Sequence, residues 1–315
     1  TDSRMNFWSS LFDKSSKRPI AYPLLGLFSV MRGYNILIVV LAQYLASIFI
    51  FNPGQPLLAT VLDFHLFLTV LASSLVIAAG YIINHFYDVE VDRINKPIKS
   101  RIDNLVSQKT KLIIYFILNT VGVLMGFFVS WRAAVFFSVY VFLIWLYSHK
   151  FKKRPISGLL FASLLAILPF FVIFVYHKNT SKVIFIHAIF LFCILLIREL
   201  VKDLENIKGA FVHNYQTIPV TYGENQTKVL ITAIALMALY PVYLLWGYPE
   251  IGLMQYYFYL VFVAFLCLVF LLWKAQSKRS YNWLHNLLKI LLVLGVFSLA
   301  LIDTSVLIAR ILNKL

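Results

Sequence analysis

Charged side chains are scarce in this chain. Only 13% of its 315 residues are charged, whereas 61% are hydrophobic. A soluble domain of this length could not cover so much apolar surface with polar groups. The composition therefore excludes an ordinary soluble enzyme and indicates a protein for which lipid is the main solvent.

Cysteine is also nearly absent. The two cysteines, Cys193 and Cys267, both lie in apolar stretches, which excludes a disulfide framework and a metal-thiolate site. The seven histidines are scattered without the spacing of zinc ligands. The sequence contains no Gly-rich phosphate loop, no nucleophile elbow and no Cys/His pair. Any chemistry must come from other groups.

Long apolar runs, by contrast, recur along the whole chain. A bilayer core of about 30 Å is crossed by about 20 apolar residues of helix, and backbone groups in lipid must bond within their own segment. We therefore predict an all-α polytopic membrane protein. Its nine transmembrane helices are expected at 23–49, 61–84, 110–129, 132–148, 156–176, 181–200, 228–246, 252–274 and 288–310. Pro169 should kink the fifth helix unless neighbouring groups satisfy the carbonyl that it frees.

The net charge of +15 would suggest a nucleic-acid partner in a soluble protein. Here the basic residues lie in short loops between apolar runs, which is typical of membrane topology, and no nucleic acid is expected. With a cytoplasmic N-terminus, all but five of the 28 Lys and Arg residues fall on the cytoplasmic side. We therefore predict an integral membrane protein with its C-terminus on the opposite side. The five exceptions are Arg132, Lys178, Lys182, Arg310 and Lys314.

The first 22 residues differ from the remainder. They are basic and contain aromatic and aliphatic residues, but they lack the apolar core and cleavage site of a signal peptide. We interpret residues 1–22 as a basic interfacial segment on an anionic leaflet, with a frayed tail as the alternative. Residues 23–315 are expected to form a single transmembrane domain.

Acidic residues are few and unevenly placed. Six of the thirteen lie in two short windows, 88–92 and 199–205, each at the cytoplasmic end of an even-numbered span. Asn84, Asp88 and Asp92 are spaced four apart, which stacks them on one face of a continuing helix. Like charges at this spacing repel, so the arrangement needs a cation. Oxygen ligands of this kind suit Mg²⁺ held by carboxylates and substrate phosphates.

The second window repeats this arrangement. Glu199 and Asp203 are four apart, and Arg198 and Lys202 are interleaved with them. Carboxylates that bind Mg²⁺, next to cations that bind phosphate oxygens, form a site for a diphosphate group. Ordinary solvated charges or interfacial salt bridges are the alternative, but two matching windows at matching helix ends favour a functional site.

These motifs resemble those of the UbiA superfamily of intramembrane prenyltransferases. The NxxxDxxxD motif is matched by Asn84, Asp88 and Asp92, and the DxxxD motif by Glu199 and Asp203, with glutamate in place of the first aspartate. The surrounding RELVKDLENIKG is similar to the variant found in the geranylgeranylglyceryl phosphate prenyltransferase branch. This motif favours a glycerophosphate or other lipid acceptor over 4-hydroxybenzoate.

Two further segments are similar to elements of that family. MRGYN, with Arg32 and Asn35, resembles the RPxN element, although glycine replaces proline, and YSHKFKKRP, with Tyr147, Lys152 and Lys153, resembles Y-S-x-x-L-K-R. The resemblance implies nine helices around a central cavity. It places the metal and diphosphate site under a cytoplasmic cap formed by the loops after the second and sixth spans.

The resemblance also implies an activity: Mg²⁺-dependent transfer of a prenyl group from an isoprenoid diphosphate to a hydrophobic lipid or aromatic acceptor in the bilayer. Asp88, Asp92, Glu199 and Asp203 would hold the metal, and Asn84 would complete or orient its shell. The residues expected to contact the substrates are Arg32, Asn35, Tyr147, Lys152, Lys153, Arg198 and Lys202.

Other functions compete with this interpretation. A UbiA-type terpene cyclase would use the same metal site, and the motifs do not separate transfer from cyclisation. A transporter would place an acid near the midplane of a broken helix, whereas the acidic windows here lie at one membrane face. A scaffold without catalysis is disfavoured because the metal-binding residue types are present.

Overall fold

The computed structural model describes residues 21–53 and 55–302, and every regular element in these ranges is a helix. The helices of the first half are α2 (Ala21–Met31), α3 (Gly33–Ala46), the π-helical turn η1 (Ser47–Phe51), α4 (Leu57–Val61), α5 (Phe64–Asn95), α6 (Pro97–Asp103), α7 (Gln108–Val129), α8 (Trp131–His149) and η2 (Phe151–Lys153). Those of the second half are α9 (Pro155–His177), α10 (Lys182–Glu205), α11 (Ile207–Val212), α12 (Ile218–Tyr222), α13 (Glu224–Trp246), η3 (Pro249–Met254), α14 (Gln255–Lys274), α15 (Lys278–Ser298) and η4 (Leu299–Leu301).

Nine helical stretches in the described part of the chain are long and apolar enough to cross a bilayer, which confirms the predicted number. The second and sixth helices continue past their expected ends at 84 and 200, to Asn95 and Glu205. Both acidic windows are therefore helical, as their spacing predicted. Residues 1–20 of the expected interfacial segment lie outside the described ranges.

The first span was predicted as one helix over 23–49, and this is wrong because the helix is broken at Arg32. This residue has left-handed backbone angles (φ 51°, ψ 53°) and separates α2 from α3, a conformation that costs a non-glycine residue about 1–3 kcal/mol. The ring of Phe28 lies against Gly33, in the space that a Cβ at position 33 would occupy. The membrane-crossing stretch is Gly33–Phe51.

The ninth helix also starts earlier than predicted. α15 begins at Lys278, where Ser277 and Ser280 form a capping box, rather than at 288. Hydropathy missed its first turns because they carry cations and amides. Part of the predicted span, residues 303–310, lies beyond the described residues.

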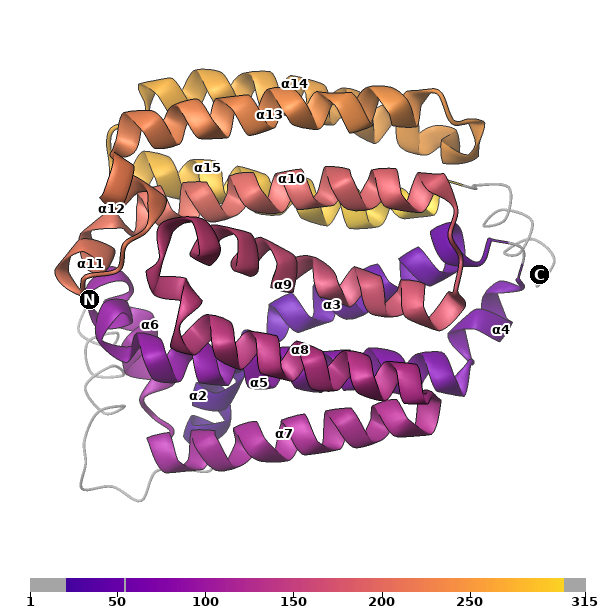
Figure 1. Ribbon diagram of the computed structural model, residues 1–315, viewed down its shortest axis with the longest axis horizontal. Coiled ribbons are helices and arrows are strands. Elements are labelled where there is room, and N and C mark those ends of the chain that lie inside the picture. Colours follow the sequence, from indigo (N-terminus) through magenta and orange to yellow (C-terminus); the bar gives the residue numbers. More distant parts are fainter. Residues whose placement is uncertain (1–20, 54, 303–315) are drawn as a thin grey trace, which may run out of the picture.

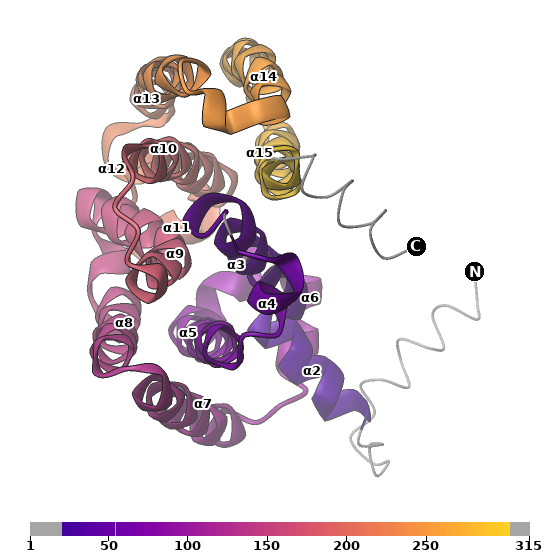
Figure 2. The ribbon, with the colours of Figure 1, turned by 90° about the vertical axis from the view of Figure 1, so that its right-hand side faces the viewer.

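Six helices follow one another around a ring. α3 packs against α5, α5 against α8, α8 against α9, α9 against α10, α10 against α15, and α15 returns to α3. Seen end-on in Figure 2, α7 lies outside α5 and α8, and α13 and α14 lie on the opposite side of the molecule. The N-terminal and C-terminal spans thus close the bundle.

The short helices α6, α11 and α12 gather at one end of the bundle (Figure 1). α6 follows α5 directly because Pro97 cannot continue that helix, and α11 packs against α5. The side chain of Asn95 donates to the carbonyl of Asn206 (3.4 Å) and Lys278 donates to the carbonyl of Asn95 (2.7 Å). The cap predicted over the second and sixth spans is therefore tied to the ends of α5, α10 and α15.

Pro169 does not break α9, which runs without interruption from Pro155 to His177. The carbonyl left without its helical donor is that of Leu165, and the buried hydroxyl of Tyr140 donates to it at 3.0 Å. Gln43 from α3 donates to the carbonyl of Pro169 at 2.9 Å. Neighbouring helices thus supply the compensation that a proline in this span requires.

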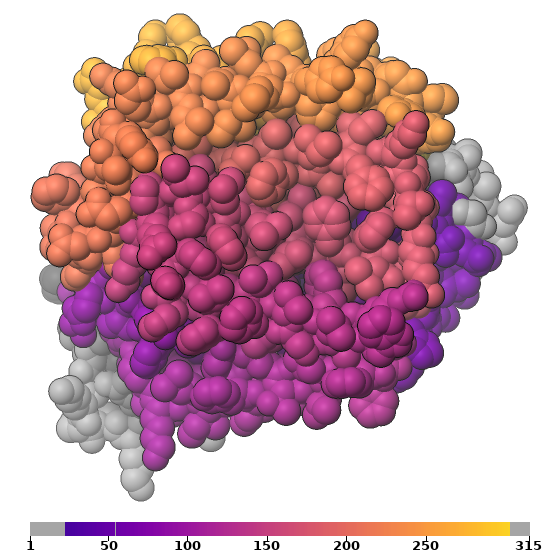
Figure 3. Space-filling view, in the orientation of Figure 1, coloured from indigo at the N-terminus to yellow at the C-terminus, as the bar shows by residue number. Residues whose placement is uncertain are grey.

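The outer faces of the bundle are apolar. Large side chains such as Phe128, Phe142 and Tyr243 are 76%, 54% and 67% exposed. Figure 3 shows one such face, covered by side chains of α7 to α10 and α13. Exposed apolar surface of this extent is the expected surface of a protein surrounded by lipid.

Candidate functional site

The first acidic window lies on the last three turns of α5. Lys152, from η2, forms an ion pair with Asp88, and its ammonium lies 3.5 Å from the side-chain oxygen of Asn84. Ser148 on α8 donates to the same oxygen of Asn84 at 3.0 Å. The end of α8 and the turn after it therefore hold two of the three predicted α5 residues.

The second window lies on the last two turns of α10. Glu199 is buried, and Arg198 (2.9 Å) and Lys202 both pair with its carboxylate. Asp203 is half-buried, and its carboxylate accepts no hydrogen bond from the described residues, whereas its backbone carbonyl accepts from Asn206. The interleaved cations predicted to bind phosphate thus neutralise Glu199 in this structure, and Asp203 has no such partner in the described chain.

The two windows face each other across Lys152 and Tyr147. The charge of Lys152 acts on Asp203 as well as on Asp88. The Tyr147 side chain, only 7% exposed, experiences the charges of Asp88, Glu199 and Asp203 together. Two stretches of chain more than 100 residues apart therefore converge at one end of the bundle, as their positions in the sequence predicted.

A cation that the sequence motifs did not include, Lys96, lies beside these acids. Its ammonium is 3.8 Å from Asp92. The pKa of Lys96 is lowered to about 8, chiefly by burial and then by the positive charge of Arg32, with smaller contributions from Lys202 and Lys152. The negative charge of Asp92 acts in the opposite direction. The spacing of four residues from Asp92 was the signal that could have identified it.

Tyr215, between α11 and α12, covers the site from the cap. Its hydroxyl lies 3.4 Å from a carboxylate oxygen of Asp88, and burial together with that carboxylate raises the pKa of Tyr215. The hydroxyl therefore stays protonated and acts as a donor. Lys153 stacks on the Tyr215 ring (5.6 Å to its centre), and its carbonyl accepts from the backbone of Gln216. Lys153 thus anchors the cap and makes no ion pair with the acids of the described residues.

Arg32 and Asn35 both contact Tyr81, which lies two turns before Asp88 on α5. The guanidinium of Arg32 lies 5.1 Å from the centre of the Tyr81 ring, and the amide of Asn35 donates to its hydroxyl at 3.3 Å. The left-handed break at Arg32 places this side chain against α5. Both predicted residues thus border the site without contacting its acids.

His85, which lies inside the first motif, contacts neither Asp88 nor Glu199 and Asp203, but a separate buried polar network. Its ring contacts the fully buried Lys111 (3.1 Å) and lies 3.5 Å from the fully buried Asp103. Lys99 and Ser29 also bind Asp103, at 2.5 and 2.6 Å. A buried polar network of this kind fixes the cap helix α6 against α2, α5 and α7.

No three acidic, histidine or cysteine side chains of the described residues are arranged as a ready-made metal site. This arrangement fits Mg²⁺, which is usually held by one or two carboxylates together with substrate phosphates and waters. The half-buried carboxylate of Asp203 has no hydrogen-bond donor in the described chain, and the carboxylates of Asp88 and Glu199 form ion pairs with long, flexible lysine and arginine side chains. All three are suitable ligands.

Comparisons with known proteins identify the family and the fold. The model of the UbiA prenyltransferase family matches residues 22–302. The chain is 27% identical over 226 residues to the digeranylgeranylglyceryl phosphate synthase of Methanosphaera stadtmanae, an alignment that covers 71% of this chain and 82% of that protein. A solved digeranylgeranylglyceryl phosphate synthase structure superposes with a TM-score of 0.65 at 21% identity, over 88% of this chain and 97% of the other. A UbiA homolog from Archaeoglobus fulgidus, bound to DMAPP and Mg²⁺, superposes with a TM-score of 0.62 at 16% identity, over 87% and 98% of the two chains.

Proposed function

Because the chain belongs to the UbiA prenyltransferase family, we propose that this membrane prenyltransferase moves a prenyl group from an isoprenoid diphosphate to a hydroxyl of a glyceryl phosphate lipid. The observation that carries the proposal is the convergence of Asp88, Glu199 and Asp203 around Tyr147 and Lys152. The names of the archaeal relatives and the RELVKDLENIKG motif support the acceptor class. An isoprenoid diphosphate is the donor that a paired-acid, lysine-rich site of this kind would bind.

Five side chains would hold Mg²⁺ and the diphosphate end of the donor. Asp88, Asp92, Glu199 and Asp203 would be the metal ligands, and Asn84, already bonded to Ser148, would orient the first window. When bound, Mg²⁺ would neutralise the negative charge that grows on the diphosphate as it leaves.

The lysines and the arginine of the site would also bind the phosphate oxygens of the donor. Lys152, Lys202 and Arg198 pair with carboxylates in this structure, and all three side chains are partly exposed. Once these carboxylates are occupied, the three cations can turn to phosphate oxygens with charge-assisted hydrogen bonds, each worth about 1.5–3 kcal/mol. Lys96 adds a fourth positive charge beside Asp92.

Tyr147 borders the space where the allylic carbon would lie. Its ring is almost fully buried, and the Lys152 ammonium is 6.0 Å from the ring centre. An aromatic face contributes about 0.5–2 kcal/mol to a nearby cation. We assign Tyr147 to shielding the allylic cation from water, and Arg32 and Asn35 to the acceptor side of the site.

We place the acidic windows, the cap and the N-terminus on the cytoplasmic side. The excess of Lys and Arg in the connections at this end supports that orientation. Single cysteines introduced at Asn214 in the cap and at Asn179 between α9 and α10 would test it. A membrane-impermeant thiol reagent added to right-side-out vesicles should label the position 179 variant and spare the position 214 variant; the opposite result would reverse the orientation.

Product analysis tests the function. Membranes containing the protein are incubated with Mg²⁺, labelled prenyl diphosphates of several lengths, and either a prenylglyceryl phosphate, 4-hydroxybenzoate or no acceptor. The proposal expects an ether-linked product with the glyceryl phosphate alone, identified by mass spectrometry. A cyclic hydrocarbon or alcohol formed without acceptor would instead establish a terpene cyclase.

A further inference from the structure

Lys289 is a charged side chain inside a membrane-spanning stretch, Lys278–Leu301. It lies eleven residues past the start of α15, which corresponds to roughly 16 Å of helix. A charged side chain inside a membrane-spanning stretch is costly and is therefore a functional candidate by default. Its hydrogen bond, of 3.4 Å, is to the neutral amide of Asn286, and it makes no ion pair with a carboxylate of the described residues.

The charges around Lys289 show which way its ammonium faces. Those that act on it are Glu205, Arg198 and Lys202 of α10, and Arg32 at the break before α3. α15 packs against both α10 and α3. The one acid among these groups, Glu205, is already bound by His285 (2.7 Å) and Asn282 (3.0 Å). Lys289 follows His285 and Asn282 by four and seven residues, so it lies on the face of α15 that is turned to α10. Its side chain is exposed there, beside more cations than unbound acids.

Arg32 is the second cation there without an acidic partner. Its guanidinium stacks on Tyr81 and pairs with no carboxylate of the described chain, and a strained backbone holds it in place. Arg198 and Lys202, by comparison, both pair with Glu199. Lys289 and Arg32 are thus two cations without a carboxylate partner in the described ranges, and the helix that follows Arg32, α3, packs against α15.

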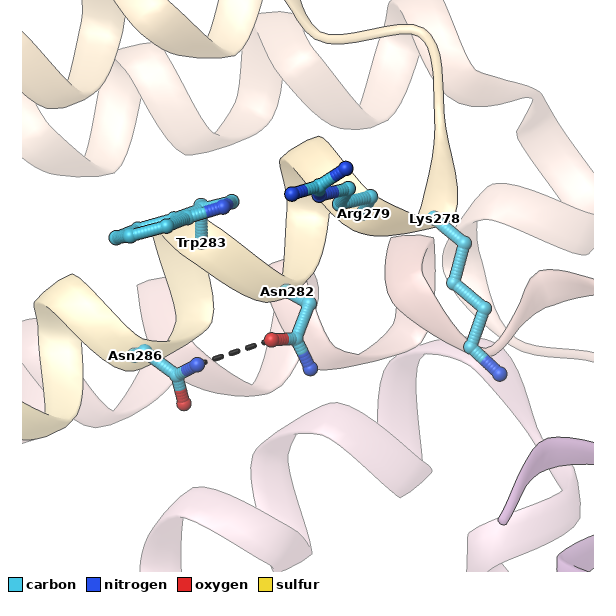
Figure 4. A pocket seen from close by; sticks show the side chains of 5 residues that line it. All are labelled: Lys278, Arg279, Asn282, Trp283 and Asn286. Carbon is cyan, nitrogen blue, oxygen red and sulfur yellow. Dashed lines mark hydrogen bonds between the residues drawn. The ribbon is translucent and has the colours of Figure 1, made fainter. Parts of the chain in front are cut away.

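A groove opens on α15 next to Lys289. It has a volume of about 570 Å³ and is lined by Lys278, Arg279, Asn282, Trp283 and Asn286. In Figure 4 the side chains of Lys278, Asn282 and Asn286 lie on one side of α15, and Arg279 and Trp283 lie on the other. Asn286 lines the groove and also accepts a hydrogen bond from Lys289, so Lys289 adjoins the groove. The lining residues include no acid, which suits a polar, negatively charged head group.

We infer that Lys289, together with Arg32, binds the phosphate group of the acceptor lipid, with the α15 groove accommodating its polar head. The inference rests on the proposed function and adds a residue of the last helix, where no motif pointed, to the acceptor site. The inference assigns the two anions of the reaction to different cations. Lys152, Arg198 and Lys202, which pair with acids in this structure, bind the diphosphate. Lys289 and Arg32, which have no acidic partner in the described residues, bind the phosphate monoester.

Kinetics of Lys289→Gln test the inference. Loss of one charge-assisted hydrogen bond should raise KM for a prenylglyceryl phosphate roughly 10- to 100-fold and leave KM for the prenyl diphosphate nearly unchanged. Lys289→Arg should retain most of the wild-type value. Lys274→Gln is the matched control, because Lys274 ends α14 with its ammonium over the Phe270 ring, away from the site, and should behave as wild type.

Two further measurements separate a phosphate contact from a general loss of acceptor binding. With an acceptor that keeps the glycerol hydroxyl but lacks the phosphate, wild type and Lys289→Gln should have equal KM values. Equilibrium binding of dodecyl phosphate to the purified protein should weaken by a similar factor in Lys289→Gln but not in Lys274→Gln. Equimolar inorganic phosphate should not displace dodecyl phosphate, which distinguishes a lipid phosphate from the free ion.

The possible outcomes distinguish failure of the anion site inferred at Lys289 and Arg32 from failure of the proposed function. An unchanged acceptor KM, an equal loss with both acceptors, or a rise confined to the KM of the prenyl diphosphate would refute the assignment of Lys289. If dodecyl phosphate binding depends on Lys289 but no phosphate-bearing acceptor is prenylated, the proposed function fails and the anion site stands. If that binding is the same in Lys289→Gln and wild type, the anion site fails whatever the enzyme makes.

Discussion

If Asp88 is a metal ligand, as we propose, Lys152 would compete with the metal for its carboxylate. In the structure its ammonium pairs with the Asp88 carboxylate and reaches the oxygen of Asn84. A divalent ion bound to Asp88 must displace it, and the displaced lysine then becomes available to the diphosphate. Replacing Lys152 by methionine should therefore have two opposite effects: the protein alone binds Mg²⁺ more tightly, and turnover of the diphosphate becomes slower.

The structure sets the size of both effects. Unit charges about 4 Å apart interact by about 4 kcal/mol at an effective dielectric constant of 20. The Lys152 and Asp88 side chains are 21% and 15% exposed, so solvent and the desolvation already incurred reduce the net value to about 1–2 kcal/mol. Lys152→Met should then lower the Kd for Mg²⁺ about 5- to 30-fold. Loss of one charge-assisted bond to phosphate should reduce kcat/KM roughly 10- to 150-fold.

The assay is calorimetric titration of Mg²⁺ into detergent-purified protein, combined with release of labelled diphosphate under subsaturating donor. Lys150→Met is the control, since Lys150 is exposed at the end of α8, two residues away. It should change neither quantity. Weaker or unchanged Mg²⁺ binding in Lys152→Met, or a lower Kd with undiminished kcat/KM, would show that Lys152 does not exchange between the acid and the phosphate.

The contacts of the site and of α9 set three further expectations. Asp88→Ala and Asp203→Ala should each reduce product to background while circular dichroism and thermal unfolding remain close to wild type; turnover surviving in either variant removes that residue from the metal site. EDTA should stop diphosphate release and added Mg²⁺ should restore it, whereas release that continues in EDTA contradicts a metal-dependent reaction. Tyr140→Phe should lower the free energy of unfolding by about 0.6–2 kcal/mol, measured by denaturation in SDS, because the carbonyl of Leu165 loses its donor.

Helix periodicity made the acidic windows predictable. Residues four apart lie on the same face of a helix, and α5 does continue through Asn84, Asp88 and Asp92. Glu199 and Asp203 follow the same rule on α10. Their convergence was predictable as well, because both windows end even-numbered spans and so must lie at the same membrane face.

The break at Arg32 was not predictable from hydropathy. The break falls at Arg32, inside a run that is mostly apolar on both sides, and hydropathy carries no information on its left-handed backbone. Lys289 was missed because polar residues precede it in α15. The polar first turns of α15 dilute its hydropathy, so a search for apolar runs starts the helix at 288 and makes this lysine look like a boundary residue.

Under the proposed function, the distribution of acidic partners among the cations would let one site distinguish two anionic substrates. A lysine that neutralises a carboxylate, such as Lys152 or Lys202, becomes available to phosphate only after another cation takes the carboxylate. Its attraction for anions is therefore conditional on the metal. Arg32 and Lys289 lack such partners among the described residues, so their attraction is permanent. An acceptor phosphate should consequently bind in the absence of Mg²⁺, and the diphosphate should not.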